Sequence, residues 1–289
     1  MAKQILKTYG GKNAKVEDIL VNRLLPGKEM KSVGPFVFLD HIYPVMQQPA
    51  TISKTAAHPH RGIATFSYML SGALEHFDSL GNHAIVEAGG VQWMNAGNGI
   101  IHDEHRGTAF QQKGGLFHGM QFWINLPAAQ KAGMPEYKAV DANNIPEVIL
   151  PDEAGVLRVL IGICGVEKSP VKTYTRQFLY HIKLNPKSAF TLPTQAGIEY
   201  AAFIPAEEIK VNDNTFGKSE LLIFEPNNQD IELYNTGITP ADIMLFGGEP
   251  YMEPIVAEGP FVMNTRTEIA EAYRDFFDGK YGTISYQAN

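Results

Sequence analysis

The chain has little of what a disulfide scaffold, a membrane protein or a nucleic-acid-binding protein needs. Its one cysteine cannot form an intrachain disulfide, and no apolar run approaches the roughly 18 residues that a membrane span requires. Its 24 basic residues are outnumbered by 31 acidic ones, which gives a net charge of -7, whereas phosphate binding requires a basic surface. We therefore expect neither direct nucleic-acid binding nor a membrane partner.

The N-terminus has no apolar segment of the kind that a secretory signal carries. A single cysteine also fits a reducing compartment. The expected location is therefore the cytoplasm, with the nucleus as a second location if the source is eukaryotic. Cys164 follows the apolar run 159–163 and is expected to be a buried strand residue, because free cysteine is among the most buried residue types.

Short apolar runs separated by Gly, Pro, Asn and Asp fill residues 15–250, and few long helical patterns lie between them. This spacing predicts an all-β fold of the sandwich or barrel type. The end of the chain differs, because Thr265 and Glu268 match a capping box and apolar residues follow at helical spacing. We expect a short C-terminal helix that stops near Gly279.

The histidines are unevenly distributed, since eight of the nine lie in the first 118 residues. His58 and His60 are two residues apart, so on a strand both side chains point to one face. His102 and Glu104 repeat this spacing with one imidazole and one carboxylate. Two such pairs on neighbouring strands can converge on one point, and we therefore predict a metal site formed by His58, His60, His102 and Glu104.

Three neutral nitrogens and one carboxylate suit one borderline divalent transition ion. Fe(II) is the first choice, and Mn, Ni, Cu and Zn are the alternatives. A structural zinc site is not expected, because such sites are usually built with thiolate ligands. Four protein ligands leave positions open for water or substrate, which is typical of a catalytic site.

The remaining polar and aromatic candidates carry weaker expectations. His105 and His118 either orient a ligand or are strand histidines with ordinary hydrogen bonds. Asp103 alternates away from the ligand face and is expected to face solvent or a hydrogen-bond partner, and His181 is expected in the core. Histidines near turn-like sequence are expected to be exposed, namely His41, His76 and His83. A minority of the strand aromatics are expected to line an apolar pocket around the metal, from a set that includes Phe66, Trp93 and Phe122.

Several motifs together resemble the pirin family, within the cupin superfamily. They are the segments 34–36, 58–62, 92–94, 96–97, 99–102, 104, 118–119, 121, 123–126 and 259–265. The resemblance implies a bicupin of two face-to-face antiparallel β-barrels, with a metal in the N-terminal one only. The implied domains are an N-terminal cupin at 1–127, a linker at 128–147, a metal-free cupin at 148–264, and a helix and tail at 265–289. The usual first cupin motif has a glutamate soon after its two histidines. Residues 63–65 offer none, so Glu104 would supply the carboxylate.

The resemblance implies two functions. One is a metal-dependent dioxygenase of the quercetinase type, which cleaves the ring of an aromatic substrate such as a flavonol, with Glu104 as the catalytic base. The other is an iron-dependent regulatory binding protein whose partner is a transcription factor or a metabolic enzyme. A third hypothesis is a cupin isomerase acting on a sugar phosphate. That hypothesis needs a basic phosphate site, and Arg61 is the only nearby candidate between His58 and His105.

Overall fold

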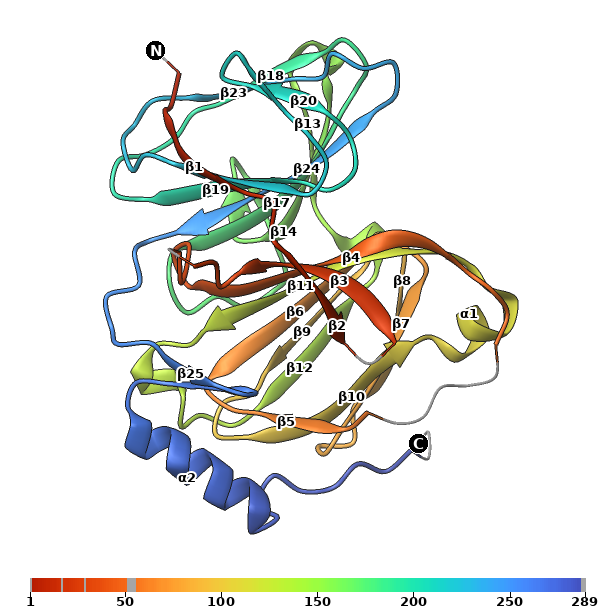
Figure 1. The fold of residues 1–289 in the computed structure, drawn as a ribbon, viewed down its shortest axis with the longest axis vertical. Helices are drawn as coiled ribbons and strands as arrows, with labels where there is room; N and C mark the ends of the chain where they lie inside the picture. The colour runs from red at the N-terminus through yellow and green to blue at the C-terminus, as the bar shows by residue number, and fades with distance from the viewer. Residues whose placement is uncertain (1, 17, 29, 51–55, 287–289) are drawn as a thin grey trace. The chain divides into compact units, whose positions relative to one another are not determined.

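The computed structural model describes residues 2–16, 18–28, 30–50 and 56–286, and its main ladders are antiparallel (Figure 1). Residue contacts divide the chain into two compact units that interleave along the sequence. Unit 1 comprises Met1–Ala14, Val21–His41 and Ile145–Tyr251, and unit 2 comprises Lys15–Leu20, Ile42–Asn144 and Met252–Asn289. The N-terminal strands β2 (Lys12–Val16), β3 (Ile19–Leu25) and β4 (Phe36–Gln47) each run from one unit into the other.

Unit 2 contains a larger sheet and a smaller four-stranded sheet. The larger sheet includes, in order, β12 (Glu136–Val140), β9 (Val91–Asn95), β6 (Ile63–Ser71) and β11 (Gly115–Asn125). The smaller sheet has the order β5 (His58–His60), β10 (Ile100–Arg106), β7 (Ala73–Asp78) and β8 (His83–Glu87). The other elements are α1 (Thr108–Lys113), η1 (Ala128–Gln130), η2 (Ala142–Asn144), the pair β25 (Val256–Glu258) and β26 (Phe261–Met263), and α2 (Arg266–Phe277).

Unit 1 has the same two kinds of sheet. Its larger sheet has the order β1 (Ile5–Tyr9), β22 (Glu220–Phe224), β19 (Glu199–Ile204), β24 (Ala241–Gly248), β17 (Gln177–Leu184), β14 (Gly155–Ile161) and β13 (Glu147–Ile149). Its smaller sheet has the order β18 (Ala189–Leu192), β23 (Ile231–Tyr234), β20 (Ile209–Val211) and β21 (Asn214–Phe216). A turn η3 (Pro151–Glu153) and a short pair, β15 (Ile163–Cys164) with β16 (Glu167–Lys168), complete it.

The two units repeat one topology. Strands β5 to β11 of unit 2 and β18 to β24 of unit 1 follow each other in the same chain order. In space, the order β9-β6-β11 matches β22-β19-β24, and the order β5-β10-β7-β8 matches β18-β23-β20-β21. Strand β18 of unit 1 therefore corresponds to β5, and β23 corresponds to β10. The core of unit 1 is filled by aliphatic and aromatic side chains from both of its sheets.

The predicted all-β architecture with two similar domains is confirmed. The larger and smaller sheets of each unit are separate in strand pairing among the described residues, so they are cupin-like sheets rather than the closed barrels that the resemblance implied. The predicted C-terminal helix is also confirmed. Thr265 and Glu268 form the capping box of α2, and Gly279 follows the helix with a positive φ of 74°.

The predicted domain boundaries at 127, 147 and 264 stay a prediction. Within the stretch 128–147, strand β12 pairs with β9 from Glu136 to Val140. Strand β1, near the N-terminus, pairs with β22 of the same unit, although the two strands lie far apart in the sequence. In the described part of the chain, we find no helix that is both long and apolar enough to span a membrane.

Candidate metal centre

The centre is built on the paired strands β5 and β10 of unit 2. The two strands are antiparallel, with Ile100 opposite His60 and His102 opposite His58. Strand β5 lies at the edge of its sheet, where Pro59 is tolerated because one side of the strand needs no ladder hydrogen bonds. Alternation along each strand then directs His58, His60 and His102 to one face, as the sequence predicts.

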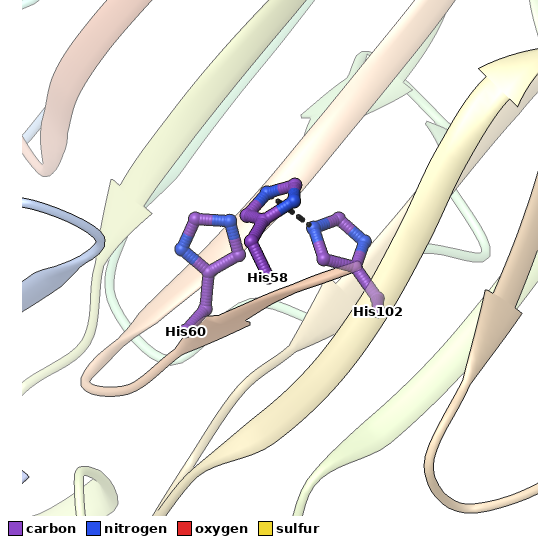
Figure 2. A group of neighbouring side chains, drawn as sticks. All are labelled: His58, His60 and His102. Atoms are coloured by element: carbon purple, nitrogen blue, oxygen red, sulfur yellow. Dashed lines mark hydrogen bonds between the residues drawn. The ribbon is translucent and has the colours of Figure 1, made fainter. Parts of the chain in front are cut away.

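The three imidazoles form a compact cluster (Figure 2). Their ring centroids are 4.9 Å apart for His58 and His60, 4.5 Å for His58 and His102, and 5.0 Å for His60 and His102. One nitrogen from each ring lies within 4.8 Å of the others. His60 and His102 are buried, whereas His58 is exposed, so the cluster is open on the His58 side.

Backbone carbonyl groups fix which nitrogen each β5 histidine offers. Nδ1 of His58 lies 2.9 Å from the Ala56 oxygen, and Nδ1 of His60 lies 2.9 Å from the Pro260 oxygen. Each Nδ1–H therefore donates to a carbonyl and leaves Nε2 with a lone pair, which is the usual arrangement of metal-binding histidines. Burial, followed by the neighbouring His58, lowers the pKa of His60 to about 3, so its imidazole is neutral as a ligand must be.

The donor set fits a divalent transition ion. Nε2 of His102 lies 3.1 Å from Nε2 of His58. Two nitrogens about 2.1 Å from one ion and at right angles to each other would be about 3.0 Å apart. Nδ1 of His102 is buried without a hydrogen-bond partner among the described residues, and burial lowers the pKa of this imidazole. The cluster can therefore hold a metal, whose identity the three side chains do not determine.

Glu104 lies two residues beyond His102 on the same strand, but its carboxylate is outside the three-histidine group. Its Oε1 accepts hydrogen bonds from Ser67, at 2.6 Å, and from Gln92. Its Oε2 accepts a hydrogen bond from Gln121. Glu104 is thus held beside the histidines by three neutral donors, and its role as fourth ligand stays a prediction.

The larger sheet presents polar side chains toward Glu104. Gln92, Ser67 and Gln121 are direct cross-strand neighbours on β9, β6 and β11, so they share one face of the sheet. The adjacent row of cross-strand neighbours is aromatic and belongs to the opposite face, with members Trp93, Phe66 and Phe122. Those three aromatics are core residues rather than pocket residues. The aromatic ring beside the cluster is instead Trp123, 5.0 Å from the His60 ring.

His76 is a site residue that the sequence reasoning missed. We expected it to be exposed, but it is 1% exposed and lies opposite Glu104 on β7. Its ring is 5.5 Å from His102, stacks on Tyr137 at 4.1 Å, and is bonded through Nε2 to Asp78 at 3.1 Å. The turn after Asp78 suggested a surface position, whereas β7 is an inner strand. The spacing of His76 and Asp78 is a third i, i+2 pair and was the available signal.

The burial of the remaining histidines and of the cysteine agrees with expectation only in part. His41 was expected to be exposed and is fully buried, bonded to Ser219. The exposed position of His83 and the buried position of His181 are confirmed. Cys164 lies on the two-residue strand β15 but is only half-buried, so the expectation of a buried residue is wrong.

Asp103 and His105 of β10 and His118 of β11 were the other polar candidates. Asp103 is buried and accepts hydrogen bonds from the Ala56 amide and the Tyr286 hydroxyl, so the hydrogen-bonding alternative is confirmed. His105 is bonded to the Arg106 carbonyl and belongs to the opposite face of β10 from His102. It is a strand histidine with an ordinary hydrogen bond. His118 is buried on β11, and its role near the site stays a prediction.

The turn after His60 is held by contacts with the C-terminal segment of unit 2 and with Lys131. Arg61 forms an ion pair with Asp275 of α2 at 2.8 Å, and its backbone bridges Phe261. Its guanidinium is therefore already engaged, which weakens the sugar-phosphate hypothesis. Lys131 is buried and donates to the Gly62 carbonyl at 2.8 Å, the Asn125 side chain at 2.6 Å and the Val262 carbonyl at 2.7 Å.

Unit 1 has no counterpart of the histidine cluster among its described residues. Strands β18 and β23 stand where β5 and β10 stand in unit 2. Their buried side chains are Leu192, Ile231 and Leu233, which belong to the apolar core and cannot bind a metal. That the second domain binds no metal stays a prediction.

Comparison with known proteins agrees with the fold. The family model "Pirin" matches residues 18–124, and "Pirin C-terminal cupin domain" matches residues 179–282. A pirin-like protein of Solanum lycopersicum is 34% identical over 272 residues, covering 91% of this chain and 87% of its own. A pirin-like protein of Caulobacter vibrioides is 32% identical over 265 residues, covering 90% and 88%.

A solved structure resembles almost the entire chain. The crystal structure of quercetin 2,3-dioxygenase from Acinetobacter baumannii is 31% identical, with a TM-score of 0.92 over 99% of this chain and 100% of that one. The two family models and the two relatives agree on the family, and the solved structure agrees with the fold. The chain belongs to the pirin family of the cupin superfamily.

Proposed function

We propose that this protein is a metal-dependent dioxygenase of the quercetinase type. The observation that carries the proposal is the cluster of three Nε2 atoms with the Glu104 carboxylate held beside it. The structural similarity to a quercetin 2,3-dioxygenase supports the same activity, with a flavonol-type aromatic substrate. The exposed His58 marks the side from which substrate would approach.

His58, His60, His102 and Glu104 would hold one divalent transition ion, Fe(II) by preference, which would act as a Lewis acid and as a template for the substrate. Burial keeps the imidazoles of His60 and His102 neutral, and the two carbonyl acceptors orient the rings of His58 and His60. Metal binding then requires no prior deprotonation of these buried rings.

Glu104 is the group that would move a proton. Its Oε1 accepts two hydrogen bonds and its Oε2 accepts one, so Oε2 has more remaining capacity for a proton. An acidic enolic hydroxyl of substrate would transfer its proton to this oxygen, which is general-base catalysis. Ser67, Gln92 and Gln121 would keep the carboxylate in place during the transfer.

The test is direct. The protein is loaded with Fe(II) without oxygen, quercetin and air are added, and the flavonol absorbance is followed, with His60→Ala as the metal-free control. We expect loss of absorbance with the loaded protein only. If none of Fe(II), Mn(II), Ni(II), Cu(II) and Zn(II) supports turnover, the enzyme proposal fails and the regulatory binding protein becomes the better hypothesis.

A further inference from the structure

Unit 1 contains a cavity of about 390 Å³ at the end of its larger sheet where β17 and β19 begin. The lining includes the aromatic residues Phe178, Tyr180 and Tyr200 and the polar residues Arg176, Gln177 and Gln195. Small-molecule sites in proteins typically measure about 300–1,000 Å³ and combine apolar walls with a few polar groups. The cavity belongs to the unit that lacks the histidine cluster, so the function proposed above does not use it.

The three aromatic residues of the lining lie close to one another. The centroid of Phe178 is 5.0 Å from that of Tyr180 and 5.1 Å from that of Tyr200. The hydroxyl of Tyr180 donates to the Ile163 carbonyl, and the hydroxyl of Tyr200 accepts from the Gln195 amide at 3.2 Å. The Tyr180 hydroxyl hydrogen is therefore engaged, whereas the Tyr200 hydroxyl still has a hydrogen to donate, and three neighbouring rings suit a planar apolar group that packs against them.

The polar side of the cavity offers hydrogen-bond donors. Arg176 is exposed, donates to the Gln195 side-chain oxygen, and forms no ion pair with a carboxylate in the described part of the chain. Gln177 is 7% exposed, and its Oε1 accepts from Thr175 at 3.0 Å. Its Nε2 makes no hydrogen bond to any described residue and still has two hydrogens to donate. A guanidinium beside an amide donor favours an anion, and a carboxylate matches the planar geometry of both.

We propose that this cavity is a second ligand site, which binds a planar aromatic carboxylate. The carboxylate is held by Arg176 and Gln177, and the ring packs against Phe178, Tyr180 and Tyr200. Metal binding is excluded as the role of this cavity, because no histidine or carboxylate lines it. The inference does not depend on the proposed dioxygenase activity.

The experiment uses trans-cinnamate as the probe and calorimetric titration as the measurement. The full-length His60→Ala variant is titrated, because it removes the predicted metal centre as a competing site for carboxylates. We expect cinnamate to bind, and both cinnamamide and hexanoate to bind at least tenfold more weakly, since each lacks one of the two recognised features.

Two variants made in the same background locate the site. Arg176→Gln should weaken cinnamate binding by about ten- to a hundredfold, the effect of losing one charge-assisted hydrogen bond. The matched control Arg158→Gln removes a guanidinium of unit 1 that does not line the cavity and should leave binding unchanged. Thr173→Trp places a large side chain at an exposed lining position and should block binding while retaining Arg176.

The proposal is overturned if His60→Ala shows no cinnamate binding, or if Arg176→Gln and Thr173→Trp bind as tightly as their background. Equal binding of cinnamamide would also contradict the carboxylate assignment. These titrations contain no metal and measure no turnover. A failure here is therefore distinguishable from a failure of the dioxygenase proposal, which the flavonol assay tests separately.

Discussion

The three histidines and Glu104 are held by different kinds of partner. His58 and His60 each donate to one backbone carbonyl, which fixes ring orientation. Glu104 instead accepts from three side chains on the larger sheet. A carbonyl partner on Nδ1 fixes the tautomer that leaves Nε2 free for a metal, and the three donors fix the position of the Glu104 carboxylate. The proposed roles therefore differ: the three histidines would only bind the metal, whereas Glu104 would complete the ligand set and also transfer a proton.

Glu104→Gln separates these two tasks. The variant retains a side-chain oxygen and the size of the residue, but it removes the carboxylate that would accept the proton. If Glu104 is the base, flavonol turnover should fall by about a hundredfold or more, the usual range for loss of a general base. Bound metal, measured on the same samples by elemental analysis, should fall much less. Wild-type turnover in a variant that retains its metal would show that Glu104 is not the base.

Lys131 predicts a measurable pH dependence of stability. It is 3% exposed, and burial lowers its pKa from 10.5 to about 7. Between pH 7 and 10.5 the unfolded chain holds a proton that the folded chain has lost, so this group makes the folded protein more stable as pH rises. Relative to Lys131→Met, the wild type should gain about 2 kcal/mol of unfolding free energy from pH 7 to pH 9.

The measurement for Lys131 is urea unfolding of both proteins at each pH. Subtracting the variant removes the contributions of the other titrating groups, since these are shared. A difference between the two proteins that stays constant from pH 7 to pH 9 would contradict the lowered pKa and would mean that Lys131 is charged in the folded protein across that range.

At the scale of elements, β5 depends on its neighbours, because it has only three residues and lies at a sheet edge. Strand β10 pairs with it on one side. The turn that follows it, at Arg61 and Gly62, contacts the segment of β26 through the Phe261 bridge and the shared bonds of Lys131. The same segment supplies the Pro260 carbonyl to His60. The position of His60 is thus set by residues about 200 positions later in the chain.

Gly62→Ala should disturb this contact. Gly62 has a φ of 81°, and a Cβ there would lie 2.1 Å from the Val262 oxygen, so the turn or β26 must move. We expect a loss of metal affinity of about ten- to a hundredfold, the range for disturbed outer partners of metal ligands. The matched control is Gly81→Ala, where φ is 85° and nothing lies within 4 Å of the new Cβ.

The two glycine variants are compared by competition with a chelator. Gly81→Ala has the backbone cost of a left-handed residue, about 1–2 kcal/mol of stability, without a steric clash. It should therefore bind metal as the wild type does. If both variants lose metal affinity equally, general destabilisation rather than the contact between the β5–β6 turn and β26 is responsible.

At the scale of the whole molecule, the sequence predicted the architecture better than the connections within it. Short runs with turn residues were enough to predict two β-domains, because strand periodicity is local. The pairing of β1 with β22 joins residues more than 200 positions apart. No local pattern encodes such a pairing, so the interleaving of the two units could not be predicted.

The candidate site shows the same contrast. His58, His60 and His102 were predictable because spacing by two residues fixes a common face of a strand. Ser67, Gln92 and Gln121 were not, because single polar residues in buried strands have no distinctive spacing. Their role depends on the register between β9, β6 and β11. The contacts of Trp123 and of the Pro260 carbonyl with His60 likewise depend on the three-dimensional structure and could not be predicted from the sequence.

The central claim is that the chain holds one metal ion, at the histidine cluster of unit 2. Its most direct test is metal titration of the metal-free protein, followed by dialysis and elemental analysis of the bound ion per chain. We predict saturation at about one ion per chain for the wild type and almost none for His60→Ala, with a folded circular dichroism spectrum in both, since the cluster needs all three imidazoles. Full occupancy in His60→Ala, or two tightly bound ions in the wild type, would contradict the account.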